Sequence, residues 1–170
     1  MNTRLSWNRV VRNLFLHKPL LPVVIALSDE THKYEVTVNW KHDTVGELKI
    51  AGKPDIQVAS PPEFDGPEGI TSPEDMFVSS ATACFMTTFV AFSNKMRFEF
   101  KTFSCKGEGT LERVEKGFEF TKIVLETTVK VGSSDLKKKA ERALELAGKY
   151  CLVSNSMKCE TEHINKVEVA

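Results

Sequence analysis

Alternation of polar and apolar residues predicts strands in the first part of the chain. Residues 33–40 read KYEVTVNW, in which valines and a threonine recur at the period of two expected of a half-buried strand. Residues 46–51 and 55–59 alternate in the same way, and Gly52 and Pro54 between them indicate a turn. We therefore expect three short strands, followed by a Pro- and Gly-rich loop over residues 60–72.

The next stretch predicts a long central helix. Ser72 is a capping residue, Pro73 suits the first helical position, and Glu74 and Asp75 favour the positive end of the helix dipole. From Met76 onward the helix has almost no polar side except Ser, Thr and Asn, so no face is suited to water. Its strongly apolar residues are too few for a membrane span. A chain of this size has difficulty covering such a helix alone, and we expect a dimer that buries it between two copies.

The C-terminal half alternates again and then returns to helical spacing. Residues 97–114 and 117–131 are long alternating segments, which predict a hairpin in a sheet that is at least partly antiparallel. Ser133 and Asp135 precede an amphipathic surface helix, and residues 161–169 predict a last strand. The apolar stripe of this helix consists of Leu136, Ala140, Ala143, Leu144 and Ala147. The order strands, helix, hairpin, helix, strand is that of an α+β domain.

The composition favours a single globular domain in the cytoplasm. A chain of 170 residues that is 41% hydrophobic and 27% charged can bury a sizeable core. Lys plus Arg equals Asp plus Glu at 23 each, so no net charge attracts nucleic acid or an anionic membrane. Four cysteines without the dense spacing of a secreted scaffold are typical of thiols in a reducing compartment.

Residues 1–32 are expected to be an N-terminal extension to a domain over residues 33–170. Residues 1–18 contain four Arg or Lys and no acid, and an apolar run follows over residues 20–27, as in a signal peptide. However, Pro19 and Pro22 punctuate this run, and residues 28–32 (SDETH) lack the small residues of a cleavage site. We expect the extension to pack on the domain or on a partner subunit.

Two of the four cysteines are candidates for chemistry. Cys84 lies in the central helix among small residues that leave room for a second group near its sulfur, although free cysteine is also a common core residue. Cys151 follows the second helix, and the Ser and Asn after it are expected to open a turn whose amides lower the pKa of this thiol. An inert, partly buried thiol is the alternative for Cys151. Cys105 and Cys159 have no neighbour that indicates reactivity and are expected to be structural.

No metal or cofactor is expected. The closest cysteines, Cys151 and Cys159, are separated by seven residues, and the four histidines lie in no paired motif. A metal site and a Cys-His nucleophile are therefore weak hypotheses.

Two motifs resemble those of the osmotically inducible protein C (OsmC) and organic hydroperoxide resistance family. Residues 71–85 (TSPEDMFVSSATACF) resemble its signature T/S-x-P-E, followed ten residues after the Glu by a cysteine in A-x-A-C-F. Residues 151–155 (CLVSN) resemble its second signature, C-P-V-S-x. The resemblance covers about residues 33–170. It implies an intertwined homodimer in which two central helices are wrapped by largely antiparallel sheets.

The resemblance implies a thiol-dependent peroxidase of the oxidative stress response. Cys84 matches the peroxidatic cysteine, whose thiolate attacks the O–O bond of an organic hydroperoxide and becomes a sulfenic acid. Cys151 matches the resolving cysteine, which condenses with it to a disulfide, and a small dithiol or lipoyl-type reductant resets the pair. Phe77, Phe85 and Met86 would suit a peroxide with a hydrophobic tail.

Glu74 matches the family's active-site glutamate. Ten residues of helix rise about 15 Å, so Glu74 cannot touch Cys84 of its own chain, and any action on a thiol must cross the dimer interface. Without the resemblance, a first-turn acid that interacts with the helix dipole is the favoured interpretation.

The arginine that peroxidase members hold against the cysteine is missing. In one branch it follows the first strand, where residues 41–46 read KHDTVG, and in the other it precedes F-x-G, where Glu63 stands. A glutamate there would raise the pKa of the thiol and slow its attack. Lys41, Arg9 and Arg12 are candidate substitutes, although lysine lacks the planar fork of arginine. A dithiol redox protein without peroxidase activity is therefore the alternative function, and a module with inert cysteines is a third.

Overall fold

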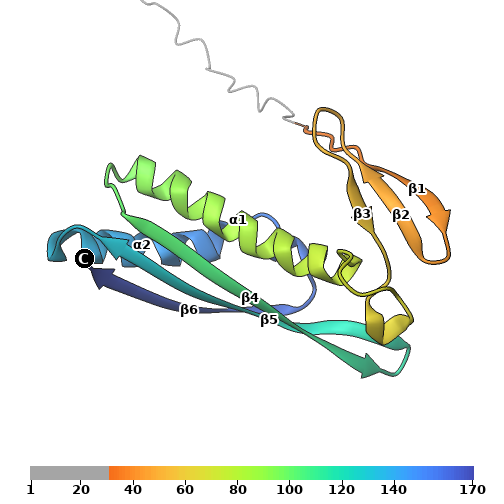
Figure 1. Ribbon diagram of the computed structural model, residues 1–170. Helices are drawn as coiled ribbons and strands as arrows, with labels where there is room; N and C mark the ends of the chain where they lie inside the picture. Colours follow the sequence, from red (N-terminus) through yellow and green to blue (C-terminus); the bar gives the residue numbers. More distant parts are fainter. Residues whose placement is uncertain (1–30) are drawn as a thin grey trace, which may run out of the picture. The chain divides into compact units, whose positions relative to one another are not determined.

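The computed structural model describes residues 31–170, so most of the expected extension, with Arg9 and Arg12, lies outside the described residues. The described residues form six strands and two long helices in the predicted order (Figure 1). The strands are β1 (Thr37–His42), β2 (Val45–Lys49), β3 (Ile56–Val58), β4 (Thr102–Val114), β5 (Gly117–Val131) and β6 (Glu160–Val169). The helices are α1 (Pro73–Lys95) and α2 (Ser134–Tyr150), with short 3-10 helices η1 (Pro62–Phe64) and η2 (Ser154–Ser156).

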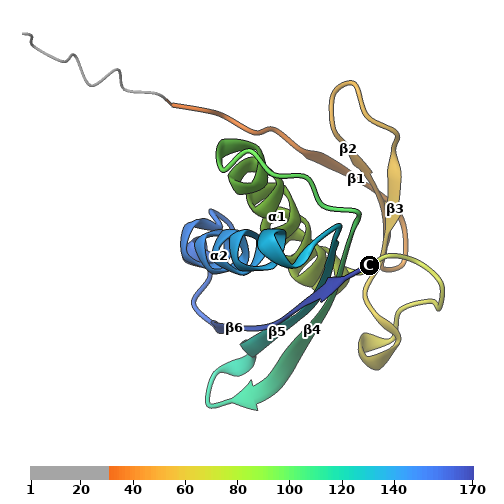
Figure 2. The same ribbon diagram turned by 90° about the vertical axis from the view of Figure 1, so that its left-hand side faces the viewer.

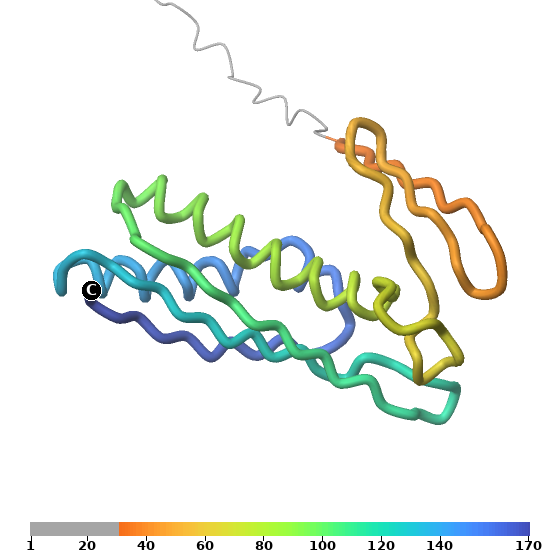
Figure 3. Tube along the Cα trace, in the orientation of Figure 1, coloured from red at the N-terminus to blue at the C-terminus, as the bar shows by residue number. Residues whose placement is uncertain are grey.

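The strands form two three-stranded sheets, which confirms the α+β class. The order is β1-β2-β3, antiparallel throughout, in one sheet and β4-β5-β6 in the other. β4 and β5 form the predicted antiparallel hairpin, whereas β6 pairs with β5 in parallel. Helices α1 and α2 both lie on one face of the second sheet (Figure 2). The Cα trace shows the cause of the parallel pairing: the chain runs back along α2 before it returns as β6 (Figure 3).

β1 differs from the predicted strand in its start and in its burial. It begins at Thr37, which pairs with Lys49 at the end of β2, because β2 offers no partner beyond that residue. The alternation is real, but every residue of β1 is exposed, including Trp40 at 73%. The expectation of a half-buried strand is therefore wrong within residues 31–170, since nothing in that part of the chain covers the face that carries Val38 and Trp40.

The start of α1 is fixed by the predicted residues. The Ser72 hydroxyl accepts a hydrogen bond from the Asp75 N–H at 3.0 Å, and the Asp75 carboxylate accepts one from the Ser72 N–H at 2.9 Å. Together with Pro73 in the first turn, these bonds form a capping box. The reciprocal bonds satisfy two N–H groups that a helix terminus otherwise leaves without partners.

Replacing the capping hydroxyl tests how much this start contributes. Ser72 is 2% exposed, so its removal leaves the Asp75 N–H without a partner in the protein. We expect Ser72→Ala to lower the free energy of unfolding by about 1 kcal/mol, measured by urea denaturation. Ser80→Ala, at an exposed position of the same helix, is the matched control. Equal stabilities of the two variants would contradict the role of the cap.

α1 is buried on one face only. Ala81, Phe85, Phe89 and Ser93 point inward, whereas Met86 on the other side is 41% exposed. The described single chain therefore leaves one side of the helix uncovered, and its burial between two copies stays a prediction. Contrary to the expectation from its sequence, the helix is long and apolar enough to suit a membrane span, as core helices of soluble proteins can also be. Its packing against β4 and α2 identifies α1 as a core helix.

The core lies between the two helices and the second sheet. From α2 it receives the predicted stripe, with Ala140, Ala143, Leu144 and Ala147 at most 1% exposed. The small alanines let α2 approach the sheet closely, where Ile123 and Leu125 of β5 are fully buried.

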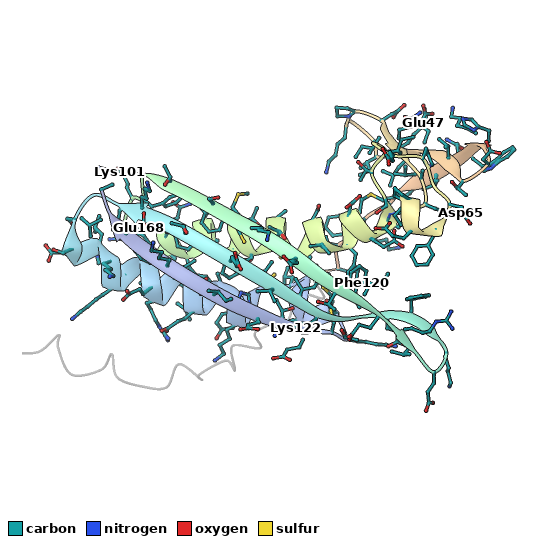
Figure 4. The ribbon with its side chains drawn as sticks, turned by 60° about the horizontal axis from the view of Figure 1, so that its bottom comes forward. Glu47, Asp65, Lys101, Phe120, Lys122 and Glu168 are labelled. Atoms are coloured by element: carbon teal, nitrogen blue, oxygen red, sulfur yellow. The ribbon has the colours of Figure 1, made fainter. Side chains whose placement is uncertain are left out.

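A bulge in β5 determines which side chains face α1. Leu111 pairs with Phe120 while Thr110 pairs with Lys122, so Thr121 is an extra residue in the ladder. As a result Phe120 and Lys122, both labelled in Figure 4, leave the sheet on opposite sides although they are two positions apart. Phe120 stacks on Phe77 of α1 with ring centroids 4.7 Å apart, and Lys122 forms an ion pair with Glu162 of β6.

Candidate active site

The fold brings Cys84 and Cys151 together. Cys84 lies in α1, and Cys151 is the fully buried residue that ends α2. The Cys151 thiol and the backbone N–H groups of Leu152 and Val153 are hydrogen-bond partners of Cys84 Sγ. Both sulfurs are free thiols. Two cysteines that lie 67 positions apart in the sequence are thus within hydrogen-bonding reach of each other.

The surroundings of Cys84 favour its thiolate. Burial alone would raise the pKa of this thiol, but hydrogen bonds from Val153 N–H, the Cys151 thiol, the Thr88 hydroxyl and Leu152 N–H together hold the pKa below its ordinary value. Thr88 Oγ1 lies 4.0 Å from Cys84 Sγ, one helical turn further along α1. None of these groups carries a charge, so within the described residues the sulfur is stabilised by dipoles.

Cys151 has the opposite tendency. Burial raises the pKa of its thiol, and the negative charge that develops on Cys84 raises it further. The Ser154 hydroxyl, 3.3 Å from Cys151 Sγ, and the Ser154 N–H lower this pKa without cancelling those effects. The expectation of a lowered Cys151 pKa is therefore wrong. The turn does form as predicted, but the N–H groups of Leu152 and Val153 are partners of Cys84 rather than of Cys151.

The directions of these pKa shifts predict the order in which the thiols react. At neutral pH we expect iodoacetamide to modify Cys84 several-fold faster than Cys105 or Cys151, because the thiolate is the reacting form. Cys105 is the matched reference: burial raises the pKa of its thiol, to which the Thr127 hydroxyl donates a hydrogen bond at 3.1 Å. Peptide mass spectrometry after brief exposure measures the order. Faster modification of Cys105 than of Cys84 would contradict this assignment of charge.

The turn after Cys151 is held by its own side chains. Asn155 Nδ2 donates to the Lys149 carbonyl oxygen at 3.0 Å, and Asn155 N–H donates to that of Cys151 at 3.1 Å. The Ser156 hydroxyl donates to the Leu152 carbonyl oxygen at 2.8 Å. These bonds fix the peptide units whose N–H groups meet the sulfur of Cys84.

Glu74 lies elsewhere, on the wall of a cavity of about 1060 Å³. The cavity lies between the 61–64 loop, α1, β4 and β5, and neither Cys84 nor Cys151 lines it. Glu74 Oε2 is buried there without a hydrogen-bond partner among residues 31–170. Glu63, Asp75 and Glu108 also line the cavity, and its described lining includes no Lys, Arg or His. Glu74 therefore does not reach the thiols of its own chain, as the rise of the helix predicts.

Among the described residues, the one candidate substitute for the missing arginine is already paired, and the position that precedes F-x-G is acidic. Lys41 Nζ forms an ion pair with Glu47 Oε2 at 3.1 Å, on the surface of the first sheet. Glu63 lies in η1 and is exposed, on the same cavity as Glu74.

Three contacts around the thiols were not predicted from the sequence. Thr88 was recognisable from its position four residues after Cys84 in a helix, and Ser154 belongs to the CLVSN segment. His163 stacks on Phe85, the neighbour of Cys84, with ring centroids 4.6 Å apart. Its position in a strand remote from both cysteines gave no signal of this contact.

Comparison with known proteins places this geometry among related chains. Residues 66–164, more than half of the chain, match the family model of OsmC-like proteins. The uncharacterized protein YmaD of Bacillus subtilis is 24% identical over 136 residues, which cover 77% of this chain and 90% of YmaD.

Two solved structures with the same fold illustrate the range of names in this group. An OsmC-like protein of unknown function from Vibrio cholerae has a TM-score of 0.70 at 22% identity, covering 82% of this chain and 100% of the other. The organic hydroperoxide resistance protein OsmC from Legionella pneumophila has a TM-score of 0.65 at 23% identity, covering 81% and 98%. At these identities the likeness shows a shared fold.

Proposed function

Because this chain belongs to the OsmC-like protein family, we propose that it is a thiol-dependent peroxidase that reduces organic hydroperoxides through Cys84 and Cys151. The observation that carries the proposal is the contact of Cys84 Sγ with the Cys151 thiol and with the amides that follow it. A similar structure named an organic hydroperoxide resistance protein supports this substrate class. The free thiols agree with action in the cytoplasm.

The proposed cycle has three steps. The Cys84 thiolate attacks one peroxide oxygen, so an S–O bond forms, the O–O bond breaks, and the alkoxide leaves as the alcohol after taking up a proton. The Cys151 sulfur then attacks the sulfenic sulfur of Cys84, an S–S bond forms and water leaves. A small dithiol of the lipoyl type reduces this disulfide by two exchanges and is itself oxidised to a cyclic disulfide.

The amides near Cys84 offer a substitute for the missing arginine. The second signature that this chain resembles, C-P-V-S-x, has proline at the position of Leu152, and proline has no N–H to donate. Leu152 therefore supplies a donor that the signature lacks, next to the one from Val153. Two backbone dipoles and two side-chain donors would take over the stabilisation of the thiolate.

We infer that a second copy of the chain completes the site. The exposed side of α1 around Met86 and the uncovered face of β1 around Trp40 leave apolar surface for a homodimer interface. Glu74, whose Oε2 has no hydrogen-bond partner among the described residues, would then act on a thiol of the other copy. In this arrangement residues 33–170 are the OsmC-like domain, and residues 1–32 are an N-terminal extension to it.

A dithiol redox protein without peroxidase activity is the second candidate. It is favoured because the hydrogen-bond donors to Cys84 within residues 31–170 include no cationic group. The acidic cavity wall at Glu63 and Glu74 favours it as well.

Turnover of cumene hydroperoxide by the purified full chain, with dihydrolipoamide as reductant, separates the two candidates. We expect turnover well above the uncatalysed rate, and faster turnover than with hydrogen peroxide at equal concentration. No turnover, together with a Cys84–Cys151 disulfide after mild oxidation, would favour the second candidate. Absence of both would contradict both functions.

A further inference from the structure

One imidazole ring lies between the two helices that carry the thiols. His163 of β6 stacks on Phe85 of α1 with ring centroids 4.6 Å apart and planes at 29°. On the α2 side, a Cβ atom built on Gly148 would lie 3.1 Å from both Cδ2 and Nε2 of this ring. Phe85 directly follows Cys84, and Gly148 precedes Cys151 by three residues. The ring therefore contacts both helices close to the two cysteines.

Gly148 shows how closely the ring and α2 approach. Any other residue would place a carbon atom closer to His163 than ordinary van der Waals contact allows. Glycine in a helix interior costs about 1 kcal/mol relative to alanine. The close packing of the imidazole against the helix backbone accounts for this unfavourable choice.

The ring has no polar partner on its buried side. His163 Nδ1 is buried without a hydrogen-bond partner among residues 31–170, and so is Thr161 Oγ1 on the same side of β6. Across the sheet His163 pairs with Leu125, which is fully buried. The pKa of His163 is held below its ordinary value by burial alone. The ring is therefore neutral at neutral pH and fills the space as an apolar group would.

We propose that His163 is a positioning residue for the Cys84–Cys151 pair: its neutral ring sets the separation of α1 from the end of α2, and a proton on the ring weakens the pairing of the two sulfurs. This proposal rests on the proposed function in so far as these cysteines form a redox pair. It adds a pH-dependent control of that pair by a residue outside the thiol chemistry.

The surroundings of the ring explain the effect of a proton. The neighbouring elements present Phe85, Gly148 and Leu125 to the ring, and the thiols nearest to these positions in the sequence are those of Cys84 and Cys151. Among residues 31–170 no carboxylate contributes to the lowered pKa, so a positive charge on the buried side of the ring would lack compensation there. Hydration of the buried Nδ1 atom would relieve this charge, and it requires that side of the ring to move away from its neighbours. The ends of α1 and α2 would then separate at pH values below about 6.5, the ordinary pKa of histidine.

Equilibration of the full chain with glutathione redox buffers tests this proposal without any peroxide. Two thiols of the protein lose two electrons and two protons to glutathione disulfide, which leaves as two molecules of glutathione. The equilibrium constant gives the effective concentration of the two thiols, and peptide mapping identifies the Cys84–Cys151 disulfide. The variants are His163→Ala, which removes the ring, and His163→Phe, which keeps its volume but cannot be charged. Asn165→Ala, at an exposed position two residues further along β6, is the matched control.

We expect the effective concentration to fall about tenfold in His163→Ala at neutral pH, a range typical of a loosened intramolecular pair. His163→Phe should have the effective concentration of the natural chain at neutral pH. Below pH about 6.5 we expect this concentration to decrease in the natural chain and to stay constant in His163→Phe. Asn165→Ala should behave as the natural chain at every pH.

Two results would overturn the proposal. One is an unchanged effective concentration in His163→Ala, and the other is an acid-side decrease that persists in His163→Phe. If His163→Ala does not fold by circular dichroism, the pH profile of His163→Phe decides alone. Failure of the natural chain to form the disulfide at any buffer ratio would instead contradict the redox pair itself. A peroxidase assay without turnover leaves the glutathione result unaffected, so the two failures are distinguishable.

Discussion

Cys84→Ser is expected to abolish hydroperoxide reduction, with a loss of turnover of about three orders of magnitude or more. The hydroxyl of serine is not ionised near neutral pH, whereas the hydrogen bonds from Val153, Leu152 and Thr88 favour the thiolate of Cys84. Steady-state consumption of cumene hydroperoxide with dihydrolipoamide measures the loss. Cys159→Ser, at a cysteine expected to be structural, is the matched control and should retain turnover.

Cys151→Ser should fail at a different step. Its Cys84 still attacks one molecule of peroxide per active site, because the amides of Leu152 and Val153 remain in place. The sulfenic acid then has no resolving thiol, so we expect a single burst followed by over-oxidation to the sulfinic acid, visible as added oxygen in the intact mass. Full turnover in Cys84→Ser, or no burst in Cys151→Ser, would contradict the assigned roles.

Phe89→Ala is expected to lower the free energy of unfolding by about 3–5 kcal/mol, the cost of a large cavity in a packed core. Phe89 is fully buried in α1, and its ring centroid lies 5.1 Å from those of Phe100 and Phe103 and 6.3 Å from that of Phe98. Urea denaturation at a fixed protein concentration measures the change.

Thr87→Ala is the matched control for this cavity, because Thr87 is exposed on the same helix. Its effect should stay within about 0.5 kcal/mol, as for most surface substitutions. A loss of less than about 1 kcal/mol in Phe89→Ala would mean that the aromatic cluster is not the main support of α1.

The elements that were predicted correctly are those whose signals are local. Ser72 and Pro73 define the start of α1 because capping depends on adjacent residues only. The stripe on α2, with Ala140 and Leu144, follows from helical spacing in the same way.

The differences arise where a distant segment decides. Alternation in residues 33–40 predicts an extended chain, but the start of β1 depends on where β2 ends at Lys49. Likewise, nothing near Thr121 indicates the bulge that turns Phe120 toward α1.

The same distinction between local and distant signals applies to the candidate site. Cys84 and Cys151 were paired by resemblance to a family and not by their spacing, because contact between two helices depends on the whole core. The direction of the Cys151 pKa was predicted wrongly because the effect of burial on this thiol is not visible in the CLVSN segment. His163 was not predicted as part of the site, because only the parallel pairing of β6 with β5 brings it next to Phe85.

Because the two sulfurs lie on α1 and at the end of α2, their oxidation would also change the conformational entropy of the unfolded chain. The proposed disulfide would close a loop over residues 84–151 that contains β4, β5 and all of α2. In the chain-entropy description such a crosslink disfavours the unfolded ensemble by about 4 kcal/mol. The oxidised chain would thus be the more resistant to unfolding, and each reduction of the pair would return the molecule to its less stable form.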